Sequence, residues 1–225
     1  MLLMPALMIL LVIVLSYIIG SIPWGIVIVR IFTGKDIRRL GSGRTGGTNV
    51  MRAAGFLAGL MTAVLDVTKG IASGWIADAL VPGNAWVKVL AAVIALLAST
   101  KSIFYTERDA AGKLHFKGGA GGATGLGAAI ALWPLSFFVI FPVAALVFVL
   151  VGYASVTTIS VAVVSTIIFA VRAVAVDAPW QYVVYGILAV LICLYALRPN
   201  LKRLREGTER VVGLRAYYLR RANQH

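Results

Sequence analysis

An uninterrupted stretch of 51 residues without a charged side chain, Gly121–Val171, constrains the fold of this chain more than any other feature. Soluble domains carry about 25% charged residues, whereas this chain has 13%, with 60% hydrophobic residues and a mean hydropathy of +0.94. The composition excludes a water-soluble globule and a disordered chain. It predicts a helical protein that crosses the membrane several times.

Other apolar segments are long enough to cross a bilayer, which needs roughly 20 residues per helix. We expect spans within Met1–Val29, Ala53–Leu80, Ala85–Phe104 and Gln181–Leu197. The first lacks a small-residue cleavage site, so we interpret it as a span and not as a removable signal. The uncharged stretch fits two long or three shorter helices, because Pro134, Pro142 and Gly152 interrupt it.

The distribution of basic residues decides whether the uncharged stretch forms two helices or three. Lys and Arg number six in residues 30–52, four in residues 101–117 and eight in residues 198–221. Basic loops stay in the cytoplasm, and only three helices within Gly121–Val171 leave all three clusters on that side. We therefore predict an all-α fold with seven spans, a break near Pro134 and a short helix over residues 121–133. Residues 1–225 form one membrane domain, with residues 198–225 as a basic cytoplasmic tail.

The net charge of +13 fits the same topology. Basic residues at a membrane edge meet anionic lipid, so we expect membrane lipids as partners and no nucleic acid. One cysteine, Cys193, and two histidines, His115 and His225, exclude a disulfide framework and leave too few ligands for a metal centre. We predict no metal and no cofactor.

Two glycine-rich loops are candidates for phosphate binding. The first, Gly41–Arg52, offers backbone N–H groups, short polar side chains and a guanidinium; the second, Phe116–Gly127, leads directly into the short helix. Backbone N–H groups at a helix N-terminus bind anions. The candidate ligands are Ser42, Gly43, Thr48, Asn49 and Arg52 in the first loop, and Lys117, Gly118, Gly119, Gly121 and Gly122 in the second. A flexible linker explains the first loop equally well, and close helix packing explains the second.

Further polar residues stand at or within the membrane. Asp66 and Lys69 are spaced i, i+3 inside the second span, where an ion pair lowers the cost of burial; a structural pair and a site pair remain equally open. Ser155 follows the turn at Gly152, and Asn200 follows the last span. Glu209 ends a basic segment typical of an interfacial helix.

The ordered motifs resemble the bacterial family of integral-membrane glycerol-3-phosphate acyltransferases that use acyl phosphate. The matching segments are Gly20–Gly25, Lys35–Arg39, Gly41–Gly43, Thr48–Arg52, Leu65–Gly70, Phe116–Gly119, Ala123–Gly127, Asn200–Leu204 and Gly207–Glu209. They occur in the family's order along nearly the whole chain.

The resemblance implies seven spans and a site on the cytoplasmic face of the bacterial inner membrane. It implies acyl transfer from acyl phosphate to the 1-hydroxyl of glycerol 3-phosphate, giving lysophosphatidic acid for phospholipid synthesis, without coenzyme A. Carried over by motif, Ser42 and Arg52 hold substrate phosphate, Gly118–Gly122 cradle the acyl phosphate, and Ser155 and Asn200 are the catalytic candidates. We expect a monomer.

Several positions depart from the family pattern. Arg44 and Gly47 replace Asn and Ala, Ala120 replaces a lysine, Leu197 replaces a histidine, Gly152 replaces an arginine, and a polar stretch, Thr106–Lys113, is added. The losses remove charge near the acyl phosphate, and Arg44, Lys101 or Lys113 are candidates to replace it. Three alternatives follow: a catalytically impaired paralogue that binds a phosphate ligand or partners a synthase, an enzyme for another polyol phosphate, and, least favoured, a transporter.

Overall fold

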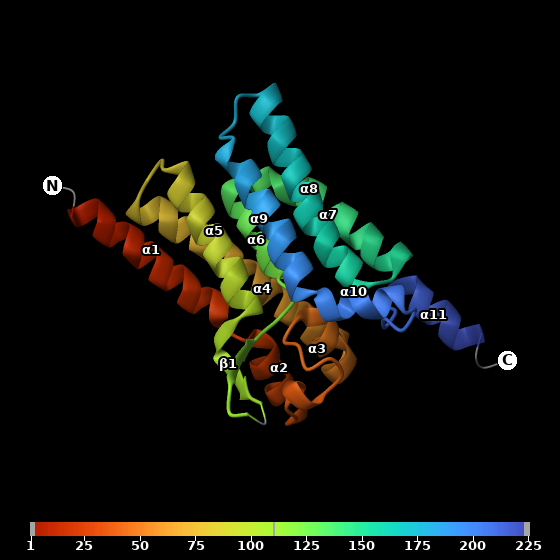
Figure 1. Cartoon of the computed structure of the whole chain (residues 1–225). Coiled ribbons are helices and arrows are strands. Elements are labelled where there is room, and N and C mark those ends of the chain that lie inside the picture. Colours follow the sequence, from red (N-terminus) through yellow and green to blue (C-terminus); the bar gives the residue numbers. More distant parts are fainter. Residues whose placement is uncertain (1–2, 110, 223–225) are drawn as a thin grey trace.

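The computed structural model describes residues 3–109 and 111–222 and forms an elongated helical bundle with a polar region at one end (Figure 1). Its helices are α1 (Leu3–Ser21), α2 (Trp24–Thr33), α3 (Gly47–Ala54), α4 (Phe56–Leu80), α5 (Ala85–Thr100), α6 (Gly122–Leu132), α7 (Phe137–Leu146), α8 (Ala154–Ala175), α9 (Gln181–Ala196), α10 (Arg198–Arg205) and α11 (Gly213–Ala222). Short helical turns are η1 (Ile37–Arg39), η2 (Pro134–Ser136) and η3 (Val147–Val151).

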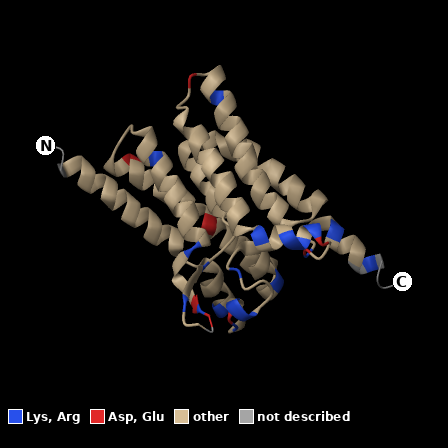
Figure 2. Cartoon of the chain, viewed as in Figure 1, with Lys and Arg blue, Asp and Glu red and all other residues tan. Residues whose placement is uncertain are grey.

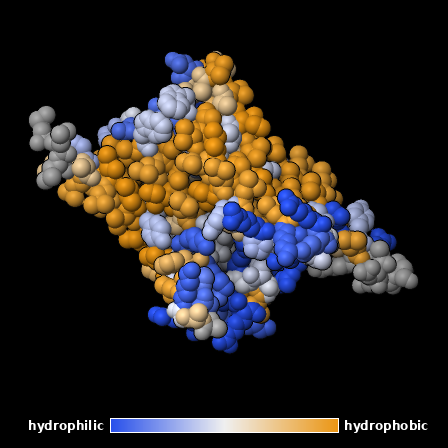
Figure 3. Space-filling model, viewed as in Figure 1, coloured by the Kyte–Doolittle hydropathy of each residue, from blue (hydrophilic) through white to orange (hydrophobic). Residues whose placement is uncertain are grey.

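The outer surface of the bundle is a broad apolar band, and the polar surface lies below it (Figure 3). Large exposed hydrophobic side chains such as Phe56, Phe138 and Val174 form part of this surface. Water would not stabilise so many exposed apolar groups, whereas lipid would. The predicted class of multi-pass membrane protein is therefore supported.

Four segments in the described residues are long and apolar enough to span a bilayer: Met4–Thr33, Phe56–Leu80, Pro134–Val151 and Ala154–Ala175. Gln181–Ala196 with Arg198–Arg205 makes a fifth only if this pair, bent by 66°, counts as one span. Helices α5 and α6 are apolar but shorter. Length and composition thus do not confirm the count of seven spans.

The first predicted span, Met1–Val29, is not one straight helix. The chain breaks between α1 and α2, where Pro23 has no N–H to continue the helix. Helix α2 then extends to Thr33 and ends at Gly34 in the left-handed conformation, with φ +68°. The break matters for the site, because it delivers the first polar loop beneath the bundle (Figure 1).

Helices α4 and α6 form the most extensive helix pair of the described bundle. Small residues make this approach possible, since a Cβ on Gly70 would lie 2.8 Å from the Gly127 carbonyl carbon. The main core cluster, including Leu96, Phe169 and Tyr185, lies among α5, α6, α8 and α9. The Tyr185 hydroxyl donates to the Gly125 carbonyl at 2.6 Å, which fixes α9 against α6.

The predicted break near Pro134 is confirmed. Helix α6 covers 11 residues and ends at Leu132, and Pro134 begins the turn η2. Eleven residues rise about 16 Å, roughly half of a 30 Å bilayer core. Since all eleven residues are buried or half-buried among neighbouring helices, α6 is a short internal helix, as its glycine content predicts.

The expectation of an all-α fold is wrong at one place. Strands β1 (Ser102–Arg108) and β2 (Leu114–Lys117) pair antiparallel, with Glu107 opposite His115. Ser102–Tyr105 and Leu114–Lys117 carry β-branched or aromatic residues, and the turn between them contains Gly112 with φ +77°. The added polar stretch therefore forms the end of a hairpin, not an irregular loop.

Lys and Arg residues gather at the polar end of the bundle, around α2, α3, α10 and the hairpin (Figure 2). Helix α10 turns away from α9 at Leu197, and α11 continues from it toward the C-terminus (Figure 1). The three basic clusters thus share one end of the molecule.

Candidate active site

The first glycine loop is held in shape by Asn49. Its Oδ1 accepts from the Ser42 N–H at 3.1 Å, and its Nδ2 donates to the carbonyls of Leu40 at 3.1 Å and Arg44 at 2.9 Å. Asn49 is buried. Both amide hydrogens are engaged by the loop itself, so Asn49 positions the loop instead of offering a free donor to a ligand.

The second glycine loop lies against the end of α5. The Gly119 N–H donates to the Ser99 carbonyl at 2.9 Å. Gly121 has φ +86° and precedes the first residue of α6, a conformation that an L side chain rarely adopts. A Cβ on Gly122 would lie 2.8 Å from Thr158 Oγ1, which places the start of α6 beside the first turns of α8.

The two glycine loops lie side by side, although about 70 residues separate them in sequence. A Cβ on Gly46 would be 4.0 Å from the Ala120 nitrogen, and one on Gly119 would be 3.7 Å from Thr45 Oγ1. Helix α3 begins at Gly47 in the same region. The structure therefore brings two sets of backbone N–H groups to one place.

Arg52 lies on α3 and reaches the C-terminal segment. Its Nη2 donates to the carbonyls of Arg210 at 3.3 Å and Val211 at 3.4 Å. Burial lowers the pKa of the Arg52 guanidinium; the charge of Arg210 lowers it further, and Glu209 opposes both. A polar cavity of about 250 Å³ opens beside it, lined by Lys35, Leu40, Gly41, Asn49, Arg52 and Ala53.

Half-buried Asn200 and buried Glu209 form a polar pair. Asn200 Nδ2 donates to Glu209 Oε1 at 2.8 Å, and Arg203 Nε is 3.6 Å from Glu209 Oε2. The Glu209 side chain is only 4% exposed. The last matching motif, Gly207–Glu209, thus folds back toward α10, and the Glu209 carboxylate orients the amide of Asn200.

Ser155 lies in the first turn of α8 and is 1% exposed. The neighbouring Tyr153 pairs with Val211, so this turn contacts the same C-terminal segment as Arg52. Among the buried polar atoms of the described residues that find no hydrogen-bond partner, four belong to the segments described above: Arg44 Nη1, Ser155 Oγ, Asn200 Oδ1 and Glu209 Oε2. Buried polar atoms are normally paired, so these atoms are candidates for contacts with a ligand.

Lys117 is engaged by the hairpin, which the sequence did not predict. It forms an ion pair with Glu107, and the Tyr105 hydroxyl lies 2.9 Å from Glu107 Oε1 and 3.0 Å from the Gly43 carbonyl oxygen. The hydrogen bond from Lys117 lowers the pKa of Glu107. Tyr105, Glu107 and Lys117 therefore link the two glycine loops, and alternating β-type residues were their only sequence signal.

The structure distinguishes among Arg44, Lys101 and Lys113, the three candidates to replace the lost positive charge. Lys113 is exposed at the hairpin turn, and Lys101 Nζ lies 5.8 Å from the centre of the Tyr195 ring. Arg44 alone of the three lies within the first glycine loop, and its guanidinium donates to the Ala196 carbonyl at the end of α9. The side chains at two departing positions, Ala120 and Leu197, belong to the apolar core cluster.

Asp66 and Lys69 form a buried ion pair at 2.7 Å. Lys69 Nζ also donates to the Ile22 carbonyl at 3.0 Å. This carbonyl belongs to the break between α1 and α2, where helix ends leave backbone groups without partners. The pair thus anchors that break to α4.

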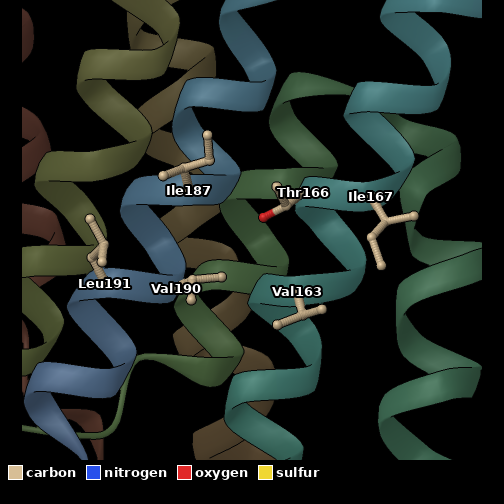
Figure 4. Close-up of a pocket in the computed structure, with 6 residues that line it drawn as sticks. All are labelled: Val163, Thr166, Ile167, Ile187, Val190 and Leu191. Carbon is tan, nitrogen blue, oxygen red and sulfur yellow. The ribbon is translucent and has the colours of Figure 1, made fainter.

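An apolar groove of about 280 Å³ lies on the outer face between α8 and α9 (Figure 4). It is lined by Val163, Thr166, Ile167, Ile187, Val190 and Leu191. Thr166 Oγ1 donates to the Ala162 carbonyl of its own helix at 2.9 Å, so the groove offers no free polar group for chemistry. No group of three His, Cys, Asp or Glu side chains gathers within residues 3–109 and 111–222.

Comparison with known proteins identifies relatives over most of the chain. A family model described as glycerol-3-phosphate acyltransferase matches residues 10–207. Glycerol-3-phosphate acyltransferase 2 of Moorella thermoacetica is 37% identical over 207 residues, covering 92% of this chain and 99% of that protein. The glycerol-3-phosphate acyltransferase of Thermus thermophilus is 36% identical, covering 90% and 94%.

The fold also matches a solved structure. The crystal structure of PlsY (YgiH), an integral membrane glycerol 3-phosphate acyltransferase, in its glycerol 3-phosphate form superposes with a TM-score of 0.78 and 30% identity. The match covers 91% of this chain and 96% of that one. The lysophosphatidic acid form of PlsY matches with a TM-score of 0.76 and 28% identity.

Proposed function

This chain belongs to the glycerol-3-phosphate acyltransferase family, and from that premise we propose that it acylates glycerol 3-phosphate, using acyl phosphate as donor, to form lysophosphatidic acid for phospholipid synthesis. One observation carries the proposal. Two glycine-rich loops from distant parts of the sequence lie side by side, next to half-buried Asn200 and buried Glu209 and close to Arg52. Such a site suits two phosphate-bearing substrates.

We assign phosphate binding to Ser42, Gly43, Thr48 and Arg52 in the first loop, with Asn49 as the residue that holds the loop. The second loop, Gly118–Gly122, cradles the acyl phosphate through backbone N–H groups other than that of Gly119, which donates to the Ser99 carbonyl. Lys117 adds positive charge at the edge of that loop, partly offset by Glu107. Ser155 and Asn200 are the catalytic candidates, and Glu209 orients Asn200.

The reaction needs no covalent enzyme intermediate. The 1-hydroxyl oxygen of glycerol 3-phosphate attacks the acyl carbonyl carbon, and the bond from that carbon to the phosphate oxygen breaks. Inorganic phosphate leaves with the electron pair, and the hydroxyl proton passes to a phosphate oxygen. His115 does not serve as the base, because it pairs with Asp109 at 2.7 Å near the exposed hairpin turn. Preorganised N–H donors and guanidinium groups stabilise the charge that develops on the leaving phosphate.

We further propose that α1–α2, α4, α5, α6, η2–α7–η3, α8 and α9 are seven membrane segments in the bacterial inner membrane. Lys and Arg gather at the end of the bundle that carries the two glycine loops (Figure 2). Because basic segments stay in the cytoplasm, this end and the site within it face the cytoplasm. Residues 1–225 act as one domain and as a monomer. Residues 198–225 lie along the cytoplasmic lipid surface, where Tyr217, Tyr218 and the basic side chains contact headgroups.

The test is acyl transfer by the purified protein in lipid, with palmitoyl phosphate and glycerol 3-phosphate as substrates. We expect lysophosphatidic acid from the wild type, loss of product in Arg52→Ala, and unchanged product in Arg39→Ala, an exposed arginine outside the site. Absence of product from a well-folded wild type, with glycerol 3-phosphate still bound, would replace this function by that of a phosphate-binding paralogue. The apolar side chains of Ala120 and Leu197 are the observation that favours that second function.

A further inference from the structure

Arg44 is a half-buried cation whose buried Nη1 atom is an unused donor. One nitrogen of its guanidinium donates to the Ala196 carbonyl, whereas Nη1 is buried and finds no acceptor in the described part of the chain. Within residues 3–109 and 111–222, no carboxylate lies within ion-pair distance of Arg44. A buried guanidinium without an anion is costly, so this arrangement indicates a missing partner.

The nearest acidic group does not supply that partner. Glu209 Oε1 accepts from Asn200, and the charge of Glu209 also acts on Arg52 and Arg203. Burial lowers the pKa of the Arg44 guanidinium and the neighbouring Arg203 lowers it further, while the charge of Glu209 opposes both from beyond ion-pair distance. The guanidinium groups of Arg44, Arg52 and Arg203 thus share the single carboxylate of Glu209, which leaves excess positive charge around it.

Arg44 stands where the two glycine loops meet. It precedes Thr45 and Gly46, the residues that approach Gly119 and Ala120. Its contact with Ala196 also places it next to Leu197. Ala120 and Leu197 are apolar and pack into the core cluster, so neither can donate to an anion between the loops.

We infer that Arg44 binds a phosphoryl oxygen of a substrate through Nη1, and so supplies the positive charge that Ala120 and Leu197 cannot. This inference rests on the proposed function and deepens it by naming a further substrate-binding residue. The ligand is a phosphate dianion, carried by glycerol 3-phosphate or by the acyl phosphate. A planar guanidinium suits such a group, because it offers its donors as a rigid fork.

The first test compares Arg44→Gln with the matched control Arg39→Gln, which removes an equally charged but exposed arginine outside the loop. We expect kcat/KM of Arg44→Gln to fall about 10²–10³-fold, as when one preorganised electrostatic contact is removed. The control should stay within about threefold of the wild type. A KM increase confined to glycerol 3-phosphate assigns Arg44 to the acceptor, and one confined to palmitoyl phosphate assigns it to the donor.

A rescue variant separates lost charge from lost structure. Arg44→Gln combined with Ala120→Lys introduces a cation from the opposite loop, and we expect it to recover at least about tenfold of the lost kcat/KM. A purely structural role for the bond to Ala196 predicts a lower thermal midpoint in Arg44→Gln and no rescue. That result, or kcat/KM of Arg44→Gln within about threefold of the wild type, would overturn the inference. If Arg44→Gln does not fold, Arg44→Lys replaces it, with the expectation of an intermediate loss.

Inorganic phosphate tests the inference without turnover. Phosphate should raise the thermal midpoint of the wild type and of Arg39→Gln, and it should raise that of Arg44→Gln much less. If the wild type makes no lysophosphatidic acid, the proposed function fails, but this binding measurement still decides the role of Arg44. An equal phosphate effect in wild type and Arg44→Gln would then refute that role.

Discussion

Replacing Gly127 by alanine tests whether the close approach of α4 and α6 positions the second glycine loop. A Cβ at Gly127 would lie 2.8 Å from the Val67 carbonyl carbon and 3.0 Å from its Cα, with the carbonyl oxygen closer still. Backbone atoms cannot rotate away as a flexible side chain can. Gly125, in the same helix, is the matched control, because its Cβ would meet Leu96 and Tyr185 at an ordinary 3.7 Å.

The expected magnitudes follow from these distances. Reaching ordinary contact at 3.4 Å requires α6 to move at least about 0.6 Å from α4, and overpacking of this kind costs typically 1–3 kcal/mol. Gly125→Ala meets no such obstacle and should gain up to about 1 kcal/mol from helix propensity. We therefore expect the two variants to differ by about 2–3 kcal/mol in stability, or roughly 5–10 °C in thermal midpoint.

Thermal unfolding of the purified variants in detergent, with loss of monodisperse elution as readout, measures this difference. Because α6 carries Gly118–Gly122 at its start, Gly127→Ala should also lose acyl transfer, whereas Gly125→Ala should keep it. Equal midpoints for the two variants would refute the reasoning, since they would mean that the α4–α6 distance is not set by backbone contact at Gly127.

Three further predictions concern polar groups. Asn49→Ala removes three hydrogen bonds of the first loop and should destabilise the protein by about 2–3 kcal/mol and raise KM for glycerol 3-phosphate; Asn49→Asp, which keeps only the acceptor and sets a buried carboxylate oxygen against two carbonyl oxygens, should be at least as damaging. Asp66→Asn should lower stability by about 3–5 kcal/mol because it strands the buried Lys69, and Asp66→Asn with Lys69→Met should recover part of that loss in thermal unfolding. Glu107 has a pKa below its ordinary value of 4.5, so its stabilising effect is complete above that value and is lost as pH falls through the lower pKa. The midpoint difference between wild type and Glu107→Gln should therefore be largest near neutral pH and narrow below about pH 4.3, and a difference independent of pH would contradict the ion pair with Lys117.

Hydropathy and charge alone predict much of this architecture. The uncharged stretch, the proline at 134 and the three basic clusters are local features of the chain, and the break after Leu132 and the basic end of the bundle agree with them. The bend at Pro23 was less evident, because apolar residues continue on both sides of it. The hairpin was missed because the predicted span Ala85–Phe104 included the start of β1, whereas α5 ends at Thr100, and because the polar residues after Phe104 also fit a loop.

The candidate site, too, could be predicted from the sequence only in part. Glycine-rich segments identified both loops, since glycine composition is visible in sequence and needs no partner to be recognised. The sequence named Asn49 and Arg44 as candidates but did not show what they contact, and it gave no role to Tyr105, because these contacts depend on atoms elsewhere in the chain. Arg44 meets Ala196, which lies 152 residues away, and Tyr105 meets Gly43, which lies 62 residues away.

The sequence by itself determined that this protein lies in a membrane, which end carries its positive charge and which loops are rich in backbone donors, because these properties depend on local composition. Only the tertiary structure decided that the two loops meet, that Lys117 pairs with Glu107 and that Arg44 Nη1 is buried without an acceptor among the described residues. The physical reason is that burial and pairing are properties of groups brought together by helix packing. The close contact of α4 with α6, set by Gly70 and Gly127, is one such packing contact, and neighbouring residues along the chain do not encode it.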